Sequence, residues 1–504
     1  MSVEDQFPGK LWLETPLIHS PHISSRLGCN VYLKLESFKF RGISHFAQNA
    51  RKTHGPDVHL VIASGGNAGI AAACAAHALG LRCTVFLPEG ASASTLDFLK
   101  GEGAEVIIEG SYYLQALGAA ERVVNAETNA VMIPAYDDAI VWEGHSSMIP
   151  EIAQQLPPGT RPDAVVCSVG GGGLSGGVMM GCKSVGWDDV PFIALETTGS
   201  NCFYEALAAN TGAFSTSGLA SANVRVEYDA THDVNIAHLA TLKSKATSLG
   251  ASSAAPGVVR MALDRKGGIK SVCVPDEFAM QAAIQFAEDH KTVVELACST
   301  TLTAAYNRAL FDKLVPPSPS GTSRTVVFVV CGGYKISLEE LEDYRTIVES
   351  SLRETKQWDV LCNGEQWIPN SYAYLNRVVG RASLVLVRVP GGLTFTFSLC
   401  PLLSVAHPYL SQFLLQTVGK GWSLAVTSRS SGGNILSLYW KGAWISRPEH
   451  YVRNVCPVCT DVPAVPFRVA VVQHHGDWEE HIDGKLEYFK IWAAHRALEF
   501  HSSV

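Results

Sequence analysis

The feature that most constrains the fold of this chain is an alternation of short apolar runs with alanine-rich helical runs, between about residues 31 and 350. Near-continuous apolar runs are typical of strands that are buried on both faces. Strands of this kind that alternate with helices form βαβ units around a mostly parallel sheet, so we predict an α/β fold. The predicted strands are Val31–Glu36, Leu60–Ser64, Cys83–Pro88, Glu105–Glu109, Ala164–Val169, Phe192–Glu196 and Thr325–Cys331, and the predicted helices include Ala68–Leu79, Tyr113–Asn125, Glu277–Asp289 and Ser337–Leu352.

Composition excludes several classes of protein. With 47% hydrophobic and 17% charged residues, the chain is not intrinsically disordered. A formal net charge of −8 provides no basic field, so we expect no nucleic-acid partner. The segment Met1–Lys10 has no apolar core, so we expect no secretory signal and interpret the 13 cysteines as reduced thiols of a cytosolic protein. Prolines interrupt the apolar stretch Gly391–Leu415, so we expect no membrane span there.

Three glycine-containing turns follow predicted strands. Gly170–Gly173 leads into a helix, and its successive backbone N–H groups suit an anion such as phosphate, although a flexible turn is the alternative. Ser64–Asn67 is placed to bind a carboxylate, although Asn67 could equally cap a helix. Cys331 and two glycines end another strand. Because ligands bind beyond the carboxyl ends of strands in open α/β sheets, we expect the three turns to meet over one pocket.

A fourth element, Phe38-Lys39-Phe40-Arg41-Gly42, follows the strand Val31–Glu36. A lysine between two phenylalanines at a strand end is placed to be desolvated, which lowers its pKa and leaves the amine able to form a Schiff base. Alone, the motif is a weak signal, because most such lysines are surface charges whose stem covers apolar surface. The four elements together are far more specific than any one of them.

Together these elements resemble the pyridoxal-phosphate enzymes of the tryptophan-synthase-β type (fold type II), and within them the eukaryotic L-serine dehydratases, which also act on threonine. The resemblance implies a two-lobed fold of open, mostly parallel sheets flanked by helices, a small amino acid as substrate, and a homodimer. It covers about residues 10–345, in the family's order. The matching motifs are Thr15-Pro16-Leu17, Tyr32-Leu33-Lys34-Leu35-Glu36, Phe38-Lys39-Phe40-Arg41-Gly42, Ser64 to Gly69, Tyr136-Asp137-Asp138, Trp142-Glu143-Gly144-His145, Ser168 to Gly173, Glu196-Thr197, Ser248-Leu249-Gly250 and Val330-Cys331-Gly332-Gly333.

The resemblance implies a role for each motif residue. Lys39 would hold pyridoxal 5'-phosphate as a Schiff base and later move the Cα proton of the substrate, and Phe38 would lie against the pyridine ring. Asn67 would bond the ring oxygen, and Cys331 would face the ring nitrogen. The phosphate would be held by Gly170, Gly171, Gly172 and Gly173. The substrate carboxylate would be held by Ser64, Gly65, Gly66 and Asn67. A monovalent cation, with K+ as the candidate, would be held by Glu196 and by the backbone of Ser200, Leu249 and Ala251.

The implied reaction is the α,β-elimination of water from L-serine, which yields pyruvate and ammonia, and from L-threonine, which yields 2-oxobutanoate. The cofactor acidifies the Cα proton by acting as an electron sink. A neutral thiol at the ring nitrogen leaves less charge in the ring, so loss of the β-hydroxyl competes with transamination. Two alternatives stay open: a β-replacing enzyme of the cysteine or cystathionine synthase type, and an inactive pyridoxal-phosphate-binding pseudoenzyme.

The chain departs from the family pattern immediately before the lysine. Glu36–Lys39 is continuous, whereas the family has about six further residues here, each of which spans about 3.3–3.6 Å when extended. The pseudoenzyme alternative depends on this shortened link. Two smaller departures are Tyr334, where relatives usually have Ser or Asn, and Ser248, where the nearest relatives have Ala.

We predict a catalytic domain at residues 1–348, with a smaller lobe of roughly residues 42–140 inserted in the larger lobe. Residues 349–504 form a C-terminal extension of uncertain fold and unknown function. The extension contains Cys456-x2-Cys459 and His475-x5-His481, a spacing at the edge of zinc-finger patterns, with ordinary cysteines and a His-rich loop as the alternative. A regulatory domain and a loosely packed extension are further alternatives for this region.

Overall fold

The computed structural model describes residues 9–37, 39–211, 223–317 and 321–353, and beyond residue 353 it describes the strands named below. Contacts divide the chain into two units, Met1–Pro369 and Asn370–Val504, and each is described by itself. The boundary between residues 348 and 349 and the limits of the smaller lobe stay predictions. Among the described residues, no helix has the length and apolar character that crossing a membrane requires.

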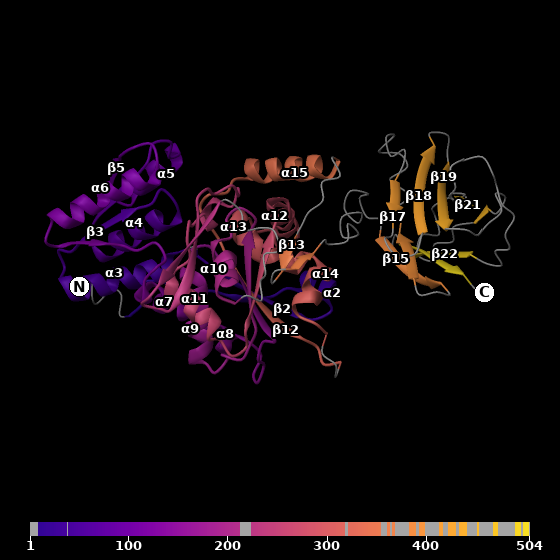
Figure 1. Cartoon of the computed structure of the whole chain (residues 1–504), viewed down its shortest axis with the longest axis horizontal. Coiled ribbons are helices and arrows are strands. Elements are labelled where there is room, and N and C mark those ends of the chain that lie inside the picture. The colour runs from indigo at the N-terminus through magenta and orange to yellow at the C-terminus, as the bar shows by residue number, and fades with distance from the viewer. Residues whose placement is uncertain are drawn as a thin grey trace. The chain divides into compact units, whose positions relative to one another are not determined.

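The first unit contains two sheets flanked by helices, as predicted, and Figure 1 shows the smaller sheet and its helices in indigo and purple. The smaller sheet is entirely parallel, in the order β5-β4-β3-β6. Its strands are β3 (His59–Ala63), β4 (Arg82–Leu87), β5 (Glu105–Ile108) and β6 (Ala130–Met132). The helices of this part of the chain are α3 (Phe40–His54), α4 (Asn67–Leu79), α5 (Ala93–Gly101) and α6 (Tyr113–Ala126).

The larger sheet has the order β1-β2-β12-β7-β8-β11-β13-β14, with a parallel centre from β2 to β11 and antiparallel strands at both edges. Its strands are β1 (Leu17–His19), β2 (Asn30–Glu36), β7 (Ala164–Ser168), β8 (Phe192–Thr197), β11 (Ile269–Val274), β12 (Thr325–Cys331), β13 (Val360–Cys362) and β14 (Glu365–Trp367). The helices are α2 (Pro21–Leu27), α7 (Ala139–Ser146), α8 (Met148–Gln155), α9 (Gly173–Ser184), α10 (Cys202–Thr211), α11 (Pro256–Leu263), α12 (Asp276–His290), α13 (Leu296–Tyr306), α14 (Arg308–Leu314) and α15 (Leu338–Arg353), with a 3-10 turn at Thr247–Leu249. A separate hairpin joins β9 (Val224–Asp229) to β10 (Val234–Leu239).

Residue type explains why these elements form. Every residue of β7 and β12 is buried, which matches their uninterrupted apolar sequences and the two-sided burial of a central parallel strand. Helix α4 is rich in alanine, the strongest helix former, and ends at Gly80 in the left-handed conformation that a C-terminal cap requires. The predicted strands and helices are confirmed, and each ends within one residue of its predicted bounds.

The second unit is described as strands only. One sheet has the order β15-β16-β23-β22 and the other has the order β17-β18-β19-β21-β20. Their bounds are β15 (Ser383–Val389), β16 (Leu393–Ser398), β17 (Phe413–Gln416), β18 (Trp422–Arg429), β19 (Gly433–Trp440), β20 (Tyr451–Val452), β21 (Phe467–Val471), β22 (Phe489–Ala494) and β23 (Ala497–Ser502). The four residues of the zinc-like pattern, Cys456, Cys459, His475 and His481, lie outside the described residues.

Candidate active site

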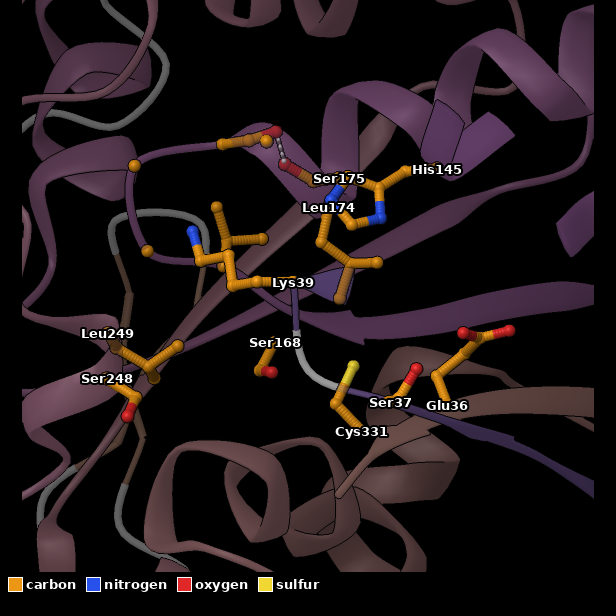
Figure 2. Close-up of a pocket in the computed structure, with 15 residues that line it drawn as sticks. Glu36, Ser37, Lys39, His145, Ser168, Leu174, Ser175, Ser248, Leu249 and Cys331 are labelled. Carbon is orange, nitrogen blue, oxygen red and sulfur yellow. Dashed lines mark hydrogen bonds between the residues drawn. The ribbon is translucent and has the colours of Figure 1, made fainter. Parts of the chain in front are cut away.

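Three neighbouring strands of the larger sheet end at one place. β2, β12 and β7 are adjacent and parallel, so their carboxyl ends lie at the same edge of the sheet. The chain continues from them into Lys39, Cys331 and the Gly170–Gly173 turn. A cavity of about 520 Å³, including its part open to solvent, lies at this edge (Figure 2). It is lined by Glu36, Ser37, Lys39, His145, Ser168 to Ser175, Ser248, Leu249 and Cys331.

Lys39 has a backbone conformation that is costly for a lysine. It directly precedes α3 and has a φ of 67°, in the left-handed region. A residue with a side chain loses about 1–2 kcal/mol in this region because its Cβ atom crowds the carbonyl oxygen. Strain of this kind is found at functional sites, where the surrounding structure holds it in place. The shortened link therefore delivers Lys39 to the cavity at a cost in backbone energy.

The Lys39 amine is desolvated, as the sequence predicts. Its Nζ atom donates to the carbonyl oxygen of Ala135 at 2.9 Å and lies 5.7 Å from the centre of the Tyr136 ring. Burial lowers the pKa of Lys39 to about 8, an effect that the nearby Cys331 thiol partly opposes. With a pKa of about 8, roughly a tenth of the amine is unprotonated at neutral pH, which is the form that attacks a carbonyl.

A buried ionic network fixes the start of α3 beside the lysine. Arg41 is fully buried and bonds Glu36 at the end of β2 at 2.5 Å and Glu151 of α8 at 2.6 Å. Glu151 also accepts from the buried ammonium of Lys34 at 2.8 Å. Burial alone would raise the pKa of Glu151, but the hydrogen bonds from Arg41 and Lys34 lower it below its ordinary value. The network therefore joins the two residues that flank the shortened link, Glu36 and Arg41.

The Gly170–Gly173 turn is packed too closely for any side chain. A Cβ atom at Gly171 would lie 2.5 Å from the Tyr136 ring, and one at Gly170 would lie 3.0 Å from the backbone of Leu249. Gly172 has a φ of 105°, which side chains rarely allow. Helix α9 starts at Gly173 without a side-chain cap, so its first N–H groups are left for an anion. The turn fits the phosphate-binding role that its sequence predicts.

Two neutral groups line the same cavity as Lys39. Burial raises the pKa of the Cys331 thiol well above its ordinary value, so the thiol stays protonated. Burial, aided by the charges of Lys39 and Arg41, lowers the pKa of His145 to about 3, so the imidazole stays neutral. His145 Nε2 is buried and has no hydrogen-bond partner among the described residues. The sequence predicted a neutral thiol, but it gave His145 no role of its own within the Trp142–His145 motif.

Asn67 is held by a carboxylate that the sequence did not single out. Its side-chain amide donates to Glu295 at 2.9 Å and to Ser248 at 3.1 Å, and its Oδ1 atom accepts from the backbone N–H of Tyr334. Ser248 also donates to Glu295 at 2.6 Å. The only signal in the sequence is that Glu295 interrupts the apolar run Val293–Ala297. These bonds fix the orientation of the Asn67 amide.

The residues predicted to hold a cation occupy a neighbouring region. Both oxygens of buried Glu196 accept from the first turn of α10, from Phe203 N at 3.0 Å and Tyr204 N at 2.7 Å, and burial raises the pKa of Glu196. Ser200 is buried nearby in sequence, and the N–H of Ala251 donates to Leu249. Among the described residues, no cluster of three or more His, Cys, Asp or Glu side chains is arranged to hold a metal ion.

The structure places seven of the predicted residues around one cavity and seven others outside its lining. Lys39, Cys331, Leu249 and the four glycines of the Gly170–Gly173 turn line it. The predicted residues that do not line it are Ser64, Gly65, Gly66, Asn67, Glu196, Ser200 and Ala251. Phe38 lies outside the described residues. The roles proposed for all of these residues stay predictions.

Comparison with known proteins defines the class to which this cavity belongs. Residues 10–332 match the family model described as "Pyridoxal-phosphate dependent enzyme", so the chain belongs to that family. The match includes Lys39, Asn67, the Gly170–Gly173 turn and Cys331. The predicted family membership is therefore confirmed.

Within the family, the chain is similar to particular dehydratases. It is 36% identical over 337 residues to the mouse (Mus musculus) protein named "Serine dehydratase-like". The aligned residues cover 66% of this chain and 93% of that protein. It is 35% identical to the human "L-serine dehydratase/L-threonine deaminase", over 66% of this chain and 94% of that protein. The crystal structure of an L-serine ammonia-lyase from the fungus Rhizomucor miehei superimposes with a TM-score of 0.58 at 31% identity, over 67% of this chain and 99% of that one.

Proposed function

We propose that this protein is a pyridoxal-phosphate-dependent lyase that eliminates water from L-serine, and from L-threonine, to give a 2-oxo acid and ammonia. The observation that carries the proposal is the desolvated Lys39 amine, with a pKa of about 8, at the edge of the sheet where Cys331 and the glycine turn also end. The names of the relatives support the same reaction.

The residues present fit the cofactor. The Gly170–Gly173 turn has no space for side chains and offers the start of α9 to a phosphate. The Lys39 amine would hold the cofactor through its carbonyl carbon, and Cys331 would supply a neutral group for the ring nitrogen. When bound, pyridoxal phosphate supplies an electron sink that acidifies the Cα proton of an amino acid.

The chain's own residues supply the remaining tasks. Lys39 Nζ takes the proton from the substrate Cα, for which a pKa close to the working pH is favourable. The backbone N–H groups of Ser64–Asn67 bind the substrate carboxylate, and the bonds that the Asn67 amide donates to Glu295 fix its orientation. His145 is neutral and so adds no charge to the buried surroundings of Lys39.

Finer features of the proposal follow from the family resemblance. A monovalent cation such as K+ is held by Glu196 with the backbone of Ser200, Leu249 and Ala251. The active form is a homodimer in the cytosol. The buried hydroxyl of Ser200 has no hydrogen-bond partner within the part of the chain that the structure describes, which supports an additional ligand in that region.

Three measurements test the proposed function. Purified protein that is mixed with pyridoxal phosphate should develop a visible absorption band that Lys39→Ala abolishes, whereas the exposed control Lys266→Ala should keep it. Pyruvate release from L-serine, followed with a coupled dehydrogenase, should accompany the band. A band without pyruvate would overturn the elimination reaction and leave the β-replacing enzyme and the pseudoenzyme as the alternatives. A protein that stays colourless with added cofactor would overturn the proposal altogether.

A further inference from the structure

A second lysine, Lys335, lies beside the loop Ser64–Asn67 that is predicted to bind the substrate carboxylate. Lys335 follows β12 by four residues, in the segment that begins at Cys331. A Cβ atom at Gly66 would lie 3.2 Å from Lys335 Nζ and 3.4 Å from its Cε atom. The ammonium therefore lies directly over Gly66, in the loop between β3 and α4, and the missing side chain of that glycine leaves the space for it.

The backbone on either side of Lys335 is fixed, so the approach to Gly66 does not depend on the side chain alone. The N–H of Lys335 donates to Glu295 at 2.7 Å, and the N–H of Tyr334 donates to Asn67 of the loop at 3.1 Å. The Tyr334 ring lies 5.0 Å from the ring of Phe98 in α5. Tyr334, the departure noted in the sequence, thus packs against the helix of the smaller sheet while its neighbour reaches the loop.

The charge at this place is not neutralised by the residues around it. Among the described residues, Lys335 has no ion pair or side-chain hydrogen bond. Helix α4 begins at Asn67 with no side-chain cap and no acidic residue in its first turn. The carboxylate of Glu295 accepts from the backbone N–H of Lys335 and also from Asn67 and Ser248. The Lys335 ammonium and the first N–H groups of α4 therefore converge on the same loop.

We propose that Lys335 is a specificity-determining residue whose ammonium pairs with the α-carboxylate of the amino-acid substrate. The proposal rests on the proposed function, because that function supplies the substrate for the Ser64–Asn67 loop. The pair selects amino acids with a free carboxylate over amides and amino alcohols, since only a carboxylate offers a charge to the ammonium. It acts on binding rather than on the chemical step, because the carboxylate keeps its charge throughout the reaction.

The test compares Lys335→Met and Lys335→Arg with the exposed control Lys266→Met in the cofactor-loaded protein. For Lys335→Met we expect KM for L-serine to rise roughly tenfold, the size of one charge-assisted bond, with kcat changed less than about twofold. Lys335→Arg should recover most of the loss. The Kd for L-serine from titration calorimetry should follow KM, whereas the Kd for L-serinamide should be the same in wild type and Lys335→Met.

Each outcome has a separate meaning. An unchanged Kd for L-serine in Lys335→Met, or an equal loss for L-serinamide, would overturn the role of Lys335. A wild type that binds L-serine but releases no pyruvate would overturn the proposed function and leave the calorimetric comparison decisive for Lys335. Raising the salt concentration should weaken L-serine binding in wild type more than in Lys335→Met, because the charge pair is screened. Because Lys335 is exposed, the variants should unfold at the wild-type urea concentration.

Discussion

The turn Gly170–Gly173 and the link Glu36–Lys39 bring backbone to the same cavity by different means. The glycine turn adopts its conformation because its residues have no side chains, and its neighbours leave no space for any. The lysine link also requires a left-handed residue, yet places a lysine there and holds it between buried ions. One turn is encoded by its own sequence, and the other depends on residues more than a hundred positions away, such as Glu151.

The largest expected effect comes from removing the ions that hold the link. Arg41→Ala leaves Glu36 and Glu151 buried with one partner fewer, and breaking a buried pair of this kind costs about 3–5 kcal/mol. Urea unfolding of the cofactor-free protein measures the loss. The matched control is Arg345→Ala, whose exposed pair with Glu288 should contribute less than about 1 kcal/mol. Equal effects in the two variants would mean that the network does not hold the link.

The corresponding change in the glycine turn should be smaller in stability and larger in binding. Gly171→Ala forces a methyl group against the Tyr136 ring, and such overpacking costs about 1–3 kcal/mol. The displaced turn should also bind pyridoxal phosphate more weakly, as measured by the visible absorption band. Gly101→Ala, which adds a methyl group where no atom lies within 4 Å, is the control and should lower neither stability nor cofactor binding. Normal cofactor affinity in Gly171→Ala would show that the turn does not touch the phosphate.

Acid should destabilise the lysine side of the cavity through His145. Its pKa is about 3 in the folded protein and about 6.5 in the unfolded chain, so the unfolded chain binds the proton first as the pH falls. The contribution of His145 to stability is therefore complete above pH 6.5. Below that pH it decreases by up to about 1.4 kcal/mol per unit until about pH 3. Urea unfolding of wild type and His145→Gln between pH 7 and 5 measures this slope. The free energy of unfolding should fall more steeply with acid in wild type than in His145→Gln. Parallel pH curves for the two proteins would show that His145 becomes charged without cost.

The smallest expected effect isolates the backbone strain at Lys39. Lys39→Ala and Lys39→Gly both remove the amine, but only glycine accepts a φ of 67° at no cost. Lys39→Gly should therefore be about 1 kcal/mol more stable than Lys39→Ala in urea unfolding. The greater freedom of glycine in the unfolded chain reduces this difference slightly. A more stable alanine variant would place the strain elsewhere in the link.

The sequence predicts those parts of the molecule that depend on local pattern. Apolar runs, alanine content and turn residues predict the strands and helices, and four consecutive glycines predict the glycine turn. The left-handed φ of Lys39 is not predicted, because a lysine has no local reason to adopt it. The bonds of Glu295 to Asn67 and of Arg41 to Glu151 also escape prediction, because each joins residues that only the fold brings together.

The hairpin β13–β14 has a practical consequence for shortening the chain. β13 lies beyond the residues that match the family model, yet it pairs with the edge of β11, a strand whose last four residues are buried. A protein cut after α15 would present the unpaired edge of β11, with its apolar side chains, to other molecules, and such edges promote aggregation. A soluble short form should therefore end after Trp367 rather than at the last helix.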